Sequence, residues 1–161
     1  MSRAYKALPT TEQLWEQFDY KPLTGELVRK RRGGKKVSTC VGAAGYKTVR
    51  VNDEDFGQHR VIWAWLTGNR VFDEIDHRDG VGSNNRINNL REATRPQNAS
   101  NQRRKKGYHY MKNRSKPWHA QIMVNYKSKS LGYYRTEAEA AAAYKKASLE
   151  LHGAFSPYSD E

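Results

Sequence analysis

Residues 71–98 read VFDEIDHRDGVGSNNRINNLREATRPQN, and they decide how the middle of this 161-residue chain folds. An apolar stretch at 71–75 is followed by a polar stretch that starts with Asp76-His77, and then by an Asn-rich loop. Apolar residues return at 87–93. This order predicts a strand, a turn, a second strand and a helix.

Three side chains of this stretch, Asp76, His77 and Asn98, suit the hydrolysis of a phosphodiester bond. That reaction needs an activated water and a cation on the scissile phosphate, both held in line. A carboxylate and an amide oxygen are ligands that suit Mg²⁺, which keeps several waters and takes few protein ligands. A neutral imidazole accepts a proton from water near neutral pH. We expect Asp76 and Asn98 to hold the cation and His77 to be the general base.

An Asp-His pair alone is most often a capped turn or a surface pair, so the spacing of the later residues matters. Asn89 follows His77 by twelve residues, and Asn98 follows Asn89 by nine. This pattern resembles the HNH endonucleases, in the subgroup whose third motif residue is asparagine. The resemblance covers residues 57–101 and includes these further elements: His59-Arg60, Trp63, Ile75, Asn84-Asn85-Arg86, Leu90-Arg91 and Gln97.

The resemblance implies a beta-beta-alpha-metal fold in which the roles of base and metal ligands fall on His77, Asp76 and Asn98. It also implies that Asn89 ties the hairpin loop to itself by hydrogen bonds and so aims the base. Asparagine in place of a third histidine favours Mg²⁺ or Mn²⁺ over Zn²⁺ or Ni²⁺. Arg91 could hold a phosphate or brace the helix, and we interpret His59 as structural.

The formal net charge of +12 and the isoelectric point near 9.9 predict a polyanionic partner, with double-stranded DNA first. The chain is basic in both halves, with +5 in residues 1–98 and +7 in residues 99–161. Two runs of cations could lie along phosphates, although a solvated loop is the alternative for the first. The expected contacts in these runs are Arg29, Arg31, Arg32, Lys35, Lys36, Arg103, Arg104, Lys105 and Lys106.

The first 66 residues predict two helices and two strands. Thr10 and Gln13 fit a capping box at the start of a short helix. Residues 26–30 and 46–51 predict two strands joined by the basic loop, and residues 59–66 predict a helix closed by Gly68.

The last third of the chain predicts a three-stranded sheet with one helix behind it. Residues 118–124 alternate in polarity as a half-buried strand does, and a turn at Asn125-Tyr126 leads into the next strand. Thr136 and Glu139 cap a helix whose inner stripe is Ala140, Tyr144, Ala147 and Leu151.

Residues 106–156 resemble the Apetala-type (ethylene-response-factor) DNA-binding domain. The matching residues include Gly107-Tyr108, Trp118, Leu131-Gly132, Thr136-Glu137 and Leu151-His152-Gly153. The resemblance implies a sheet that enters the major groove of DNA. The residues expected to meet DNA are Arg114, His119, Gln121, Met123, Lys127 and Lys129. A protein-binding module is the alternative.

The expected class is α+β, in four parts: a β-rich leader (1–58), a nuclease core (59–101), a basic linker (102–107) and a DNA-binding domain (108–158). The single cysteine, Cys40, excludes an internal disulfide. No apolar run approaches the ~20 residues of a membrane span, and the start lacks a signal-peptide pattern. We therefore expect an intracellular, cytoplasmic protein.

The sequence as a whole predicts a metal-dependent DNA endonuclease of the homing type, of the kind that phage genomes often encode. A monomer with one core would favour nicking of one strand, whereas a dimer could cut both. The main alternative is a DNA-binding regulator that has lost nuclease activity. A nuclease directed at branched DNA or RNA is a further alternative.

Overall fold

The computed structural model describes residues 6–30, 40–42, 45–101 and 106–159. These residues form helices and small antiparallel sheets, which confirms the expected mixed α+β class. The chain divides into two compact units, Met1–Ala93 and Thr94–Glu161, and each is described by itself. Among the described helices, none is long and apolar enough to cross a membrane.

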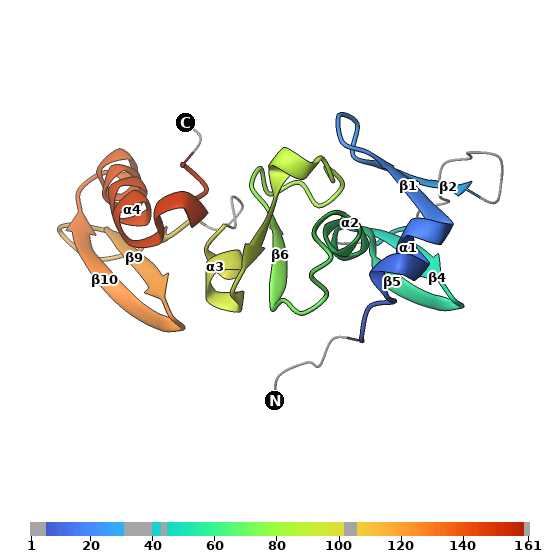
Figure 1. Cartoon of the computed structure of the whole chain (residues 1–161). Coiled ribbons are helices and arrows are strands. Elements are labelled where there is room, and N and C mark those ends of the chain that lie inside the picture. Colours follow the sequence, from blue (N-terminus) through green and yellow to red (C-terminus); the bar gives the residue numbers. More distant parts are fainter. Residues whose placement is uncertain (1–5, 31–39, 43–44, 102–105, 160–161) are drawn as a thin grey trace. The chain divides into compact units, whose positions relative to one another are not determined.

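The first unit opens with a helix and a hairpin, coloured blue in Figure 1: α1 (Thr11–Gln17), β1 (Phe18–Lys21) and β2 (Glu26–Arg29). The predicted capping box is present, because Thr10 Oγ1 accepts a hydrogen bond from the Gln13 amide and Gln13 Oε1 accepts one from the Thr10 amide. β1 pairs with β2 across a turn in which Gly25 has a φ of +72°.

A three-stranded sheet follows, with β4 in its centre, formed by β3 (Cys40–Val41), β4 (Lys47–Val51) and β5 (Glu54–Gly57). The strands predicted at 26–30 and 46–51 exist as β2 and β4, but the described strands do not pair with each other across the basic loop. Each pairs with strands closer along the chain. The tight turn at Asn52-Asp53, with φ values of 48° and 64°, favours the short β4–β5 hairpin.

The predicted helix before the polar stretch is α2, and it ends at Gly68 as expected; the elements after it are β6, η2 and β7. The bounds are α2 (Gln58–Thr67), β6 (Glu74–His77), η2 (Ile87–Asn89) and β7 (Leu90–Ala93). β6 pairs antiparallel with β7, so that Asp76 lies opposite Arg91. The sequence predicted a turn at Asp76-His77, whereas both residues belong to β6. The reason is their burial, with only 4% and 2% of their surfaces exposed.

One apolar core joins α1, both hairpins β1–β2 and β4–β5, α2 and the β6–β7 pair. α1 and the β1–β2 hairpin contribute Leu14, Phe18 and Leu27, while α2 and β6 contribute Ile62 and Ile75. Burial of such side chains stabilises the fold by roughly 1.5–3 kcal/mol each. The strand that carries Asp76 and His77 is therefore anchored by residues from the start of the chain.

The second unit is a small helix followed by a three-stranded sheet in the order β10-β9-β8 and a long helix, α4, that lies across one face of the sheet (Figure 1). Ala120, Ile122, Ala140 and Ala147 are buried, which confirms the predicted alternation and the alanine-rich inner face. Leu151, predicted for the same stripe, is 41% exposed. The bounds are α3 (Arg95–Ser100), β8 (Tyr108–Tyr110), β9 (Trp118–Val124), β10 (Lys127–Tyr134), α4 (Glu137–His152) and η3 (Gly153–Phe155).

The close approach of Gly25 to the Asn-rich loop gives a test of this packing. A Cβ at position 25 would lie 2.7 Å from the Arg86 nitrogen and the Asn85 carbonyl carbon, both backbone atoms, whereas a Cβ at Gly68 would meet nothing within 4 Å. Both glycines have the same φ of +72°. Gly68→Ala should lower the free energy of unfolding by about 1 kcal/mol, and Gly25→Ala by about 3 kcal/mol. Urea unfolding monitored by the methyl signals of buried Ile62 measures both, and equal losses would contradict the packing.

Candidate functional site

His77 is held by a chain of buried side-chain hydrogen bonds. Its Nε2 lies 2.9 Å from Asn85 Oδ1, and Asn85 Nδ2 donates to Gln58 Oε1 over 2.9 Å. With Asn85 Nδ2 committed to Gln58, Asn85 Oδ1 faces the ring, and this arrangement favours the neutral tautomer with the proton on Nε2. Burial lowers the pKa of His77, opposed by the Asn85 hydrogen bond and by Asp79 and Asp76. This direction favours the neutral ring at pH 7.

Two further rings surround His77. The His59 ring centroid lies 5.2 Å from that of His77, and the Tyr46 ring centroid lies 5.6 Å away. Tyr46 also packs so closely on Gly82 that a Cβ there would come within 2.9 Å of its ring. Burial lowers the pKa of His59 to about 3, with further lowering by His77 and Arg60. Tyr46 belongs to a stretch that was predicted only as a strand, so nothing in the sequence indicated a place beside His77.

Asp76 is engaged by Arg91. Both Nε and Nη2 of the guanidinium approach Asp76 Oδ2, at 2.8 Å and 2.6 Å. Both side chains are buried, with 9% and 5% of the Arg91 and Asp76 side chains exposed. Phosphate binding and helix bracing were the two roles expected for Arg91. Its place in the structure is opposite Asp76, on the neighbouring strand.

Asn89 holds the loop that follows His77. Its Oδ1 accepts a hydrogen bond from the Asp79 amide, and its Nδ2 donates to Asp79 Oδ1 and to the Asn84 carbonyl oxygen, over 2.8–3.0 Å. Although burial opposes it, hydrogen bonds from Asn84, the Val81 amide and Asn89 lower the pKa of Asp79. The bonds that the resemblance implied for Asn89 are thus present in the loop.

Asn98 lies on α3 in the second unit and is half-buried. Asp76 lies in the first unit. A carboxylate and an amide oxygen form a donor set that fits Mg²⁺. Within the described ranges, no group of three or more His, Cys, Asp and Glu side chains is placed to hold a metal ion.

The predicted phosphate contacts in the basic runs are only partly described. Arg29 donates from Nη2 to the Arg50 carbonyl oxygen and lies over the Phe18 ring. Lys106 forms an ion pair of 3.3 Å with Glu137. The remaining predictions fall outside the described residues: Arg31, Arg32, Lys35, Lys36, Arg103, Arg104 and Lys105.

The sheet of the second unit has one face away from α4, and the predicted residues His119, Gln121 and Met123 share it. Arg114 lies over the Tyr133 ring, which stacks on His119 at 4.6 Å. The register puts Lys127 opposite Val124 and Lys129 opposite Ile122, so both lysines stand on the opposite face of the sheet from Gln121. Further residues of the open face that the sequence did not single out are His109, Ser128, Ser130 and Tyr133.

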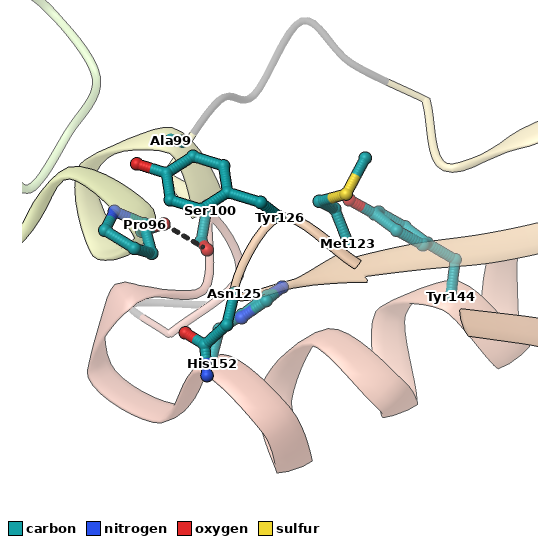
Figure 2. Close-up of a pocket in the computed structure, with 8 residues that line it drawn as sticks. All are labelled: Pro96, Ala99, Ser100, Met123, Asn125, Tyr126, Tyr144 and His152. Carbon is teal, nitrogen blue, oxygen red and sulfur yellow. Dashed lines mark hydrogen bonds between the residues drawn. The ribbon is translucent and has the colours of Figure 1, made fainter. Parts of the chain in front are cut away.

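A pocket of 360 Å³ lies in the second unit, and Figure 2 shows the side chains around it. Met123 is the one lining residue among the predicted site residues, and Ser100 Oγ donates a hydrogen bond of 2.8 Å to the carbonyl oxygen of Pro96, another lining residue. The pocket is lined by Pro96, Ala99, Ser100, Met123, Asn125, Tyr126, Tyr144 and His152.

Residues 56–100 match the family model described as HNH endonuclease. Among solved structures, the chain is similar to one titled "DNA binding and cleavage by the HNH homing endonuclease I-HmuI", with 26% sequence identity and a TM-score of 0.45. That similarity covers 53% of this chain and 51% of the other, so it spans about half of that protein. No curated protein matches the chain.

The burial of His59 predicts a specific dependence of stability on pH. Its pKa is about 3 in the folded protein and near 6.5 when exposed, so between these values only the unfolded chain binds the proton. Stability from this group is therefore full above pH 6.5 and falls below it, by up to about 1.4 kcal/mol per pH unit. Replacing His59 by Phe should reduce the loss between pH 7 and pH 5 by about 2 kcal/mol.

Urea titrations at both pH values, monitored by the Ile62 methyl signals, measure this difference. The control is His109→Phe, which replaces an exposed histidine ring and leaves His59 in place. A pH dependence unchanged in His59→Phe would contradict the assignment.

Proposed function

We propose that this protein is a metal-dependent DNA endonuclease of the HNH type. The observation that carries the proposal lies within residues 56–100, the segment that matches the family model. There, Asp76 and His77 stand at the end of β6, and Asn89 fastens the loop behind them by hydrogen bonds. A strand-borne pair held by such a loop has the rigidity that in-line attack on a phosphate requires.

The chemistry of Asp76 and Asn98 fits a divalent cation, Mg²⁺ first and Mn²⁺ as a substitute. Both offer hard oxygen donors, and Mg²⁺ needs only one or two such ligands because it keeps its waters. A cation held there would supply positive charge to the scissile phosphate and to the leaving oxygen.

His77 is the proposed general base. The Asn85 hydrogen bond supports Nδ1 as the atom that accepts the proton of the attacking water. Burial keeps the imidazole in its neutral, basic form at pH 7. Asn89 and Asp79 fix the loop that starts directly after His77 and so limit rotation of the strand end.

The second unit is proposed to bind double-stranded DNA as an Apetala-type domain, through the sheet face away from α4. The net charge of +12 supports a polyanionic partner, and the face offers His119, Gln121 and the cation Arg114. The basic runs at 29–36 and 103–106 would add phosphate contacts. With one core per chain, a monomer would nick one strand, as a homing-type enzyme with separate cutting and reading parts.

Removal of the base tests the catalytic role. His77→Ala should lower the rate of cleavage of plasmid DNA with Mg²⁺ by roughly 10²–10⁴-fold, because a positioned base contributes about that factor. DNA affinity should stay within about twofold, since His77 is not among the proposed DNA contacts. EDTA should abolish cleavage, and His152→Ala, at the end of α4, should cleave at the wild-type rate. Full cleavage by His77→Ala would refute the role.

The orientation of the sheet gives a second test. Met123, on the open face, and Leu149, on α4, are 56% and 40% exposed, so a glutamate fits at either position. Met123→Glu should weaken binding to duplex DNA by about tenfold, which corresponds to ~1.4 kcal/mol of like-charge repulsion. Leu149→Glu should change it by less than about twofold. Fluorescence anisotropy at a fixed salt concentration measures both affinities. Equal losses would contradict DNA binding by the sheet face away from α4.

A DNA-binding regulator without nuclease activity is the second candidate. Two observations favour it: Arg91 engages Asp76 Oδ2, and His77 is only 2% exposed. If wild-type protein binds DNA but cleaves no duplex, single-stranded or branched substrate with Mg²⁺ or Mn²⁺, the protein is a DNA-binding regulator and not a nuclease.

A further inference from the structure

Asn85 lies within hydrogen-bond distance of the His77 ring, and its own position is tightly constrained. It is 1% exposed, and both ends of its amide are used within the first unit. Gln58, which accepts from Asn85 Nδ2, is 3% exposed and stands in the first turn of α2. A buried amide with its oxygen and nitrogen both committed cannot rotate without breaking hydrogen bonds worth about 1 kcal/mol or more each.

The backbone of Asn85 is held from a third side by the β1–β2 hairpin. Tyr20, on β1, donates from its hydroxyl to the Asn85 carbonyl oxygen over 2.8 Å, and this contact is buried. Gly25, in the hairpin turn, lies against the backbone between Asn85 and Arg86 with no room for a side chain. Hairpin and helix thus fix both the peptide and the amide of one residue.

We propose that Asn85 is a positioning residue that fixes the tautomer and orientation of His77, and that the β1–β2 hairpin acts on the site by holding Asn85 in place. This inference rests on the proposed function for its effect on cleavage, but the tautomer is independent of it. The leader of the chain would then be part of the catalytic scaffold as well as a carrier of basic residues.

The alternative arrangement is chemically distinct. If Asn85 were turned to present its Nδ2 hydrogens to the ring, Nε2 would have to hold the lone pair and Nδ1 the proton. An imidazole in that tautomer offers a different atom to the attacking water. A wrong tautomer is a known way to lose most of a histidine base's activity without losing the fold.

The first experiment is a long-range proton–nitrogen NMR correlation of the histidine rings in the full-length, metal-free, ¹⁵N-labelled protein at pH 7.5. The His77 signals are assigned by their loss in His77→Ala. The expected result is a neutral ring with the proton on Nε2. A neutral ring with the proton on Nδ1 would overturn the proposal, whether or not the protein cleaves DNA.

Variants of Asn85 then test whether Asn85 sets the tautomer of His77. Asn85→Leu keeps the approximate volume but has no acceptor, so the His77 ring should lose its single-tautomer spectrum and kcat should fall by about 10–100-fold at little changed KM. Asn85→Asp keeps an oxygen toward Nε2, while the Gln58 amide can turn to donate to the new carboxylate. This variant should restore the Nε2–H tautomer and most of the lost rate. Identical spectra in the wild type and Asn85→Leu would overturn the proposal.

Tyr20→Phe tests whether the β1–β2 hairpin holds Asn85 in place. It remains informative if Asn85→Leu fails to fold. It removes only the hydroxyl that reaches the Asn85 carbonyl oxygen. The expected result is a folded protein with partial tautomer mixing and a kcat lowered by about threefold to tenfold. An unchanged spectrum and kcat would remove the hairpin from the proposal. A wild type with the expected tautomer but no cleavage of any DNA would refute the proposed function and leave the role of Asn85 as a tautomer lock.

Discussion

The burial of two adjacent polar residues at the end of β6 is the constraint on which the first unit depends. Burying an ionised carboxylate or an imidazole without partners costs several kcal/mol, comparable to the net stability of a small domain. Asp76 is therefore matched by Arg91 across the strand pair, and His77 by Asn85. Each partner is itself buried and needs support, so the requirement spreads from the strand into α2 and the hairpin.

This requirement explains why the leader and the nuclease-like segment share one core. Leu14, Phe18 and Leu27 pack in the same cluster as Ile62, Ile75 and Leu90. A small chain cannot give each segment a separate core of useful size. Packing the β1–β2 hairpin against the Asn-rich loop adds apolar burial and also delivers Tyr20 to the Asn85 carbonyl oxygen. Stability and alignment of His77 thus come from the same contacts.

Much of this fold follows from local sequence signals, and the rest depends on contacts between distant residues. The capping boxes at Thr10 and Thr136, the Gly68 helix end and the alternation in β9 were predicted because each is set within a few residues. The partners of β2 and β4 were not, although they lie close along the chain, because the short strands β1 and β5 were not recognised from the sequence. The Asp-His-Asn-Asn spacing identified the candidate site, whereas the contact of Gln58 with Asn85 has no sequence signature.

The Asp76–Arg91 pair sets the electrostatic condition that a nuclease here has to meet. Arg91 Nε donates a hydrogen bond to Asp76 Oδ2, and Arg91 Nη2 lies 2.6 Å from the same oxygen. Under the proposed function, Asp76 would hold the divalent cation, and Arg91 would exchange its contact with Asp76 Oδ2 for the phosphate. Such an exchange keeps every buried charge paired throughout, which the low dielectric of the site demands. It also reconciles the ion pair with the phosphate role first considered for Arg91.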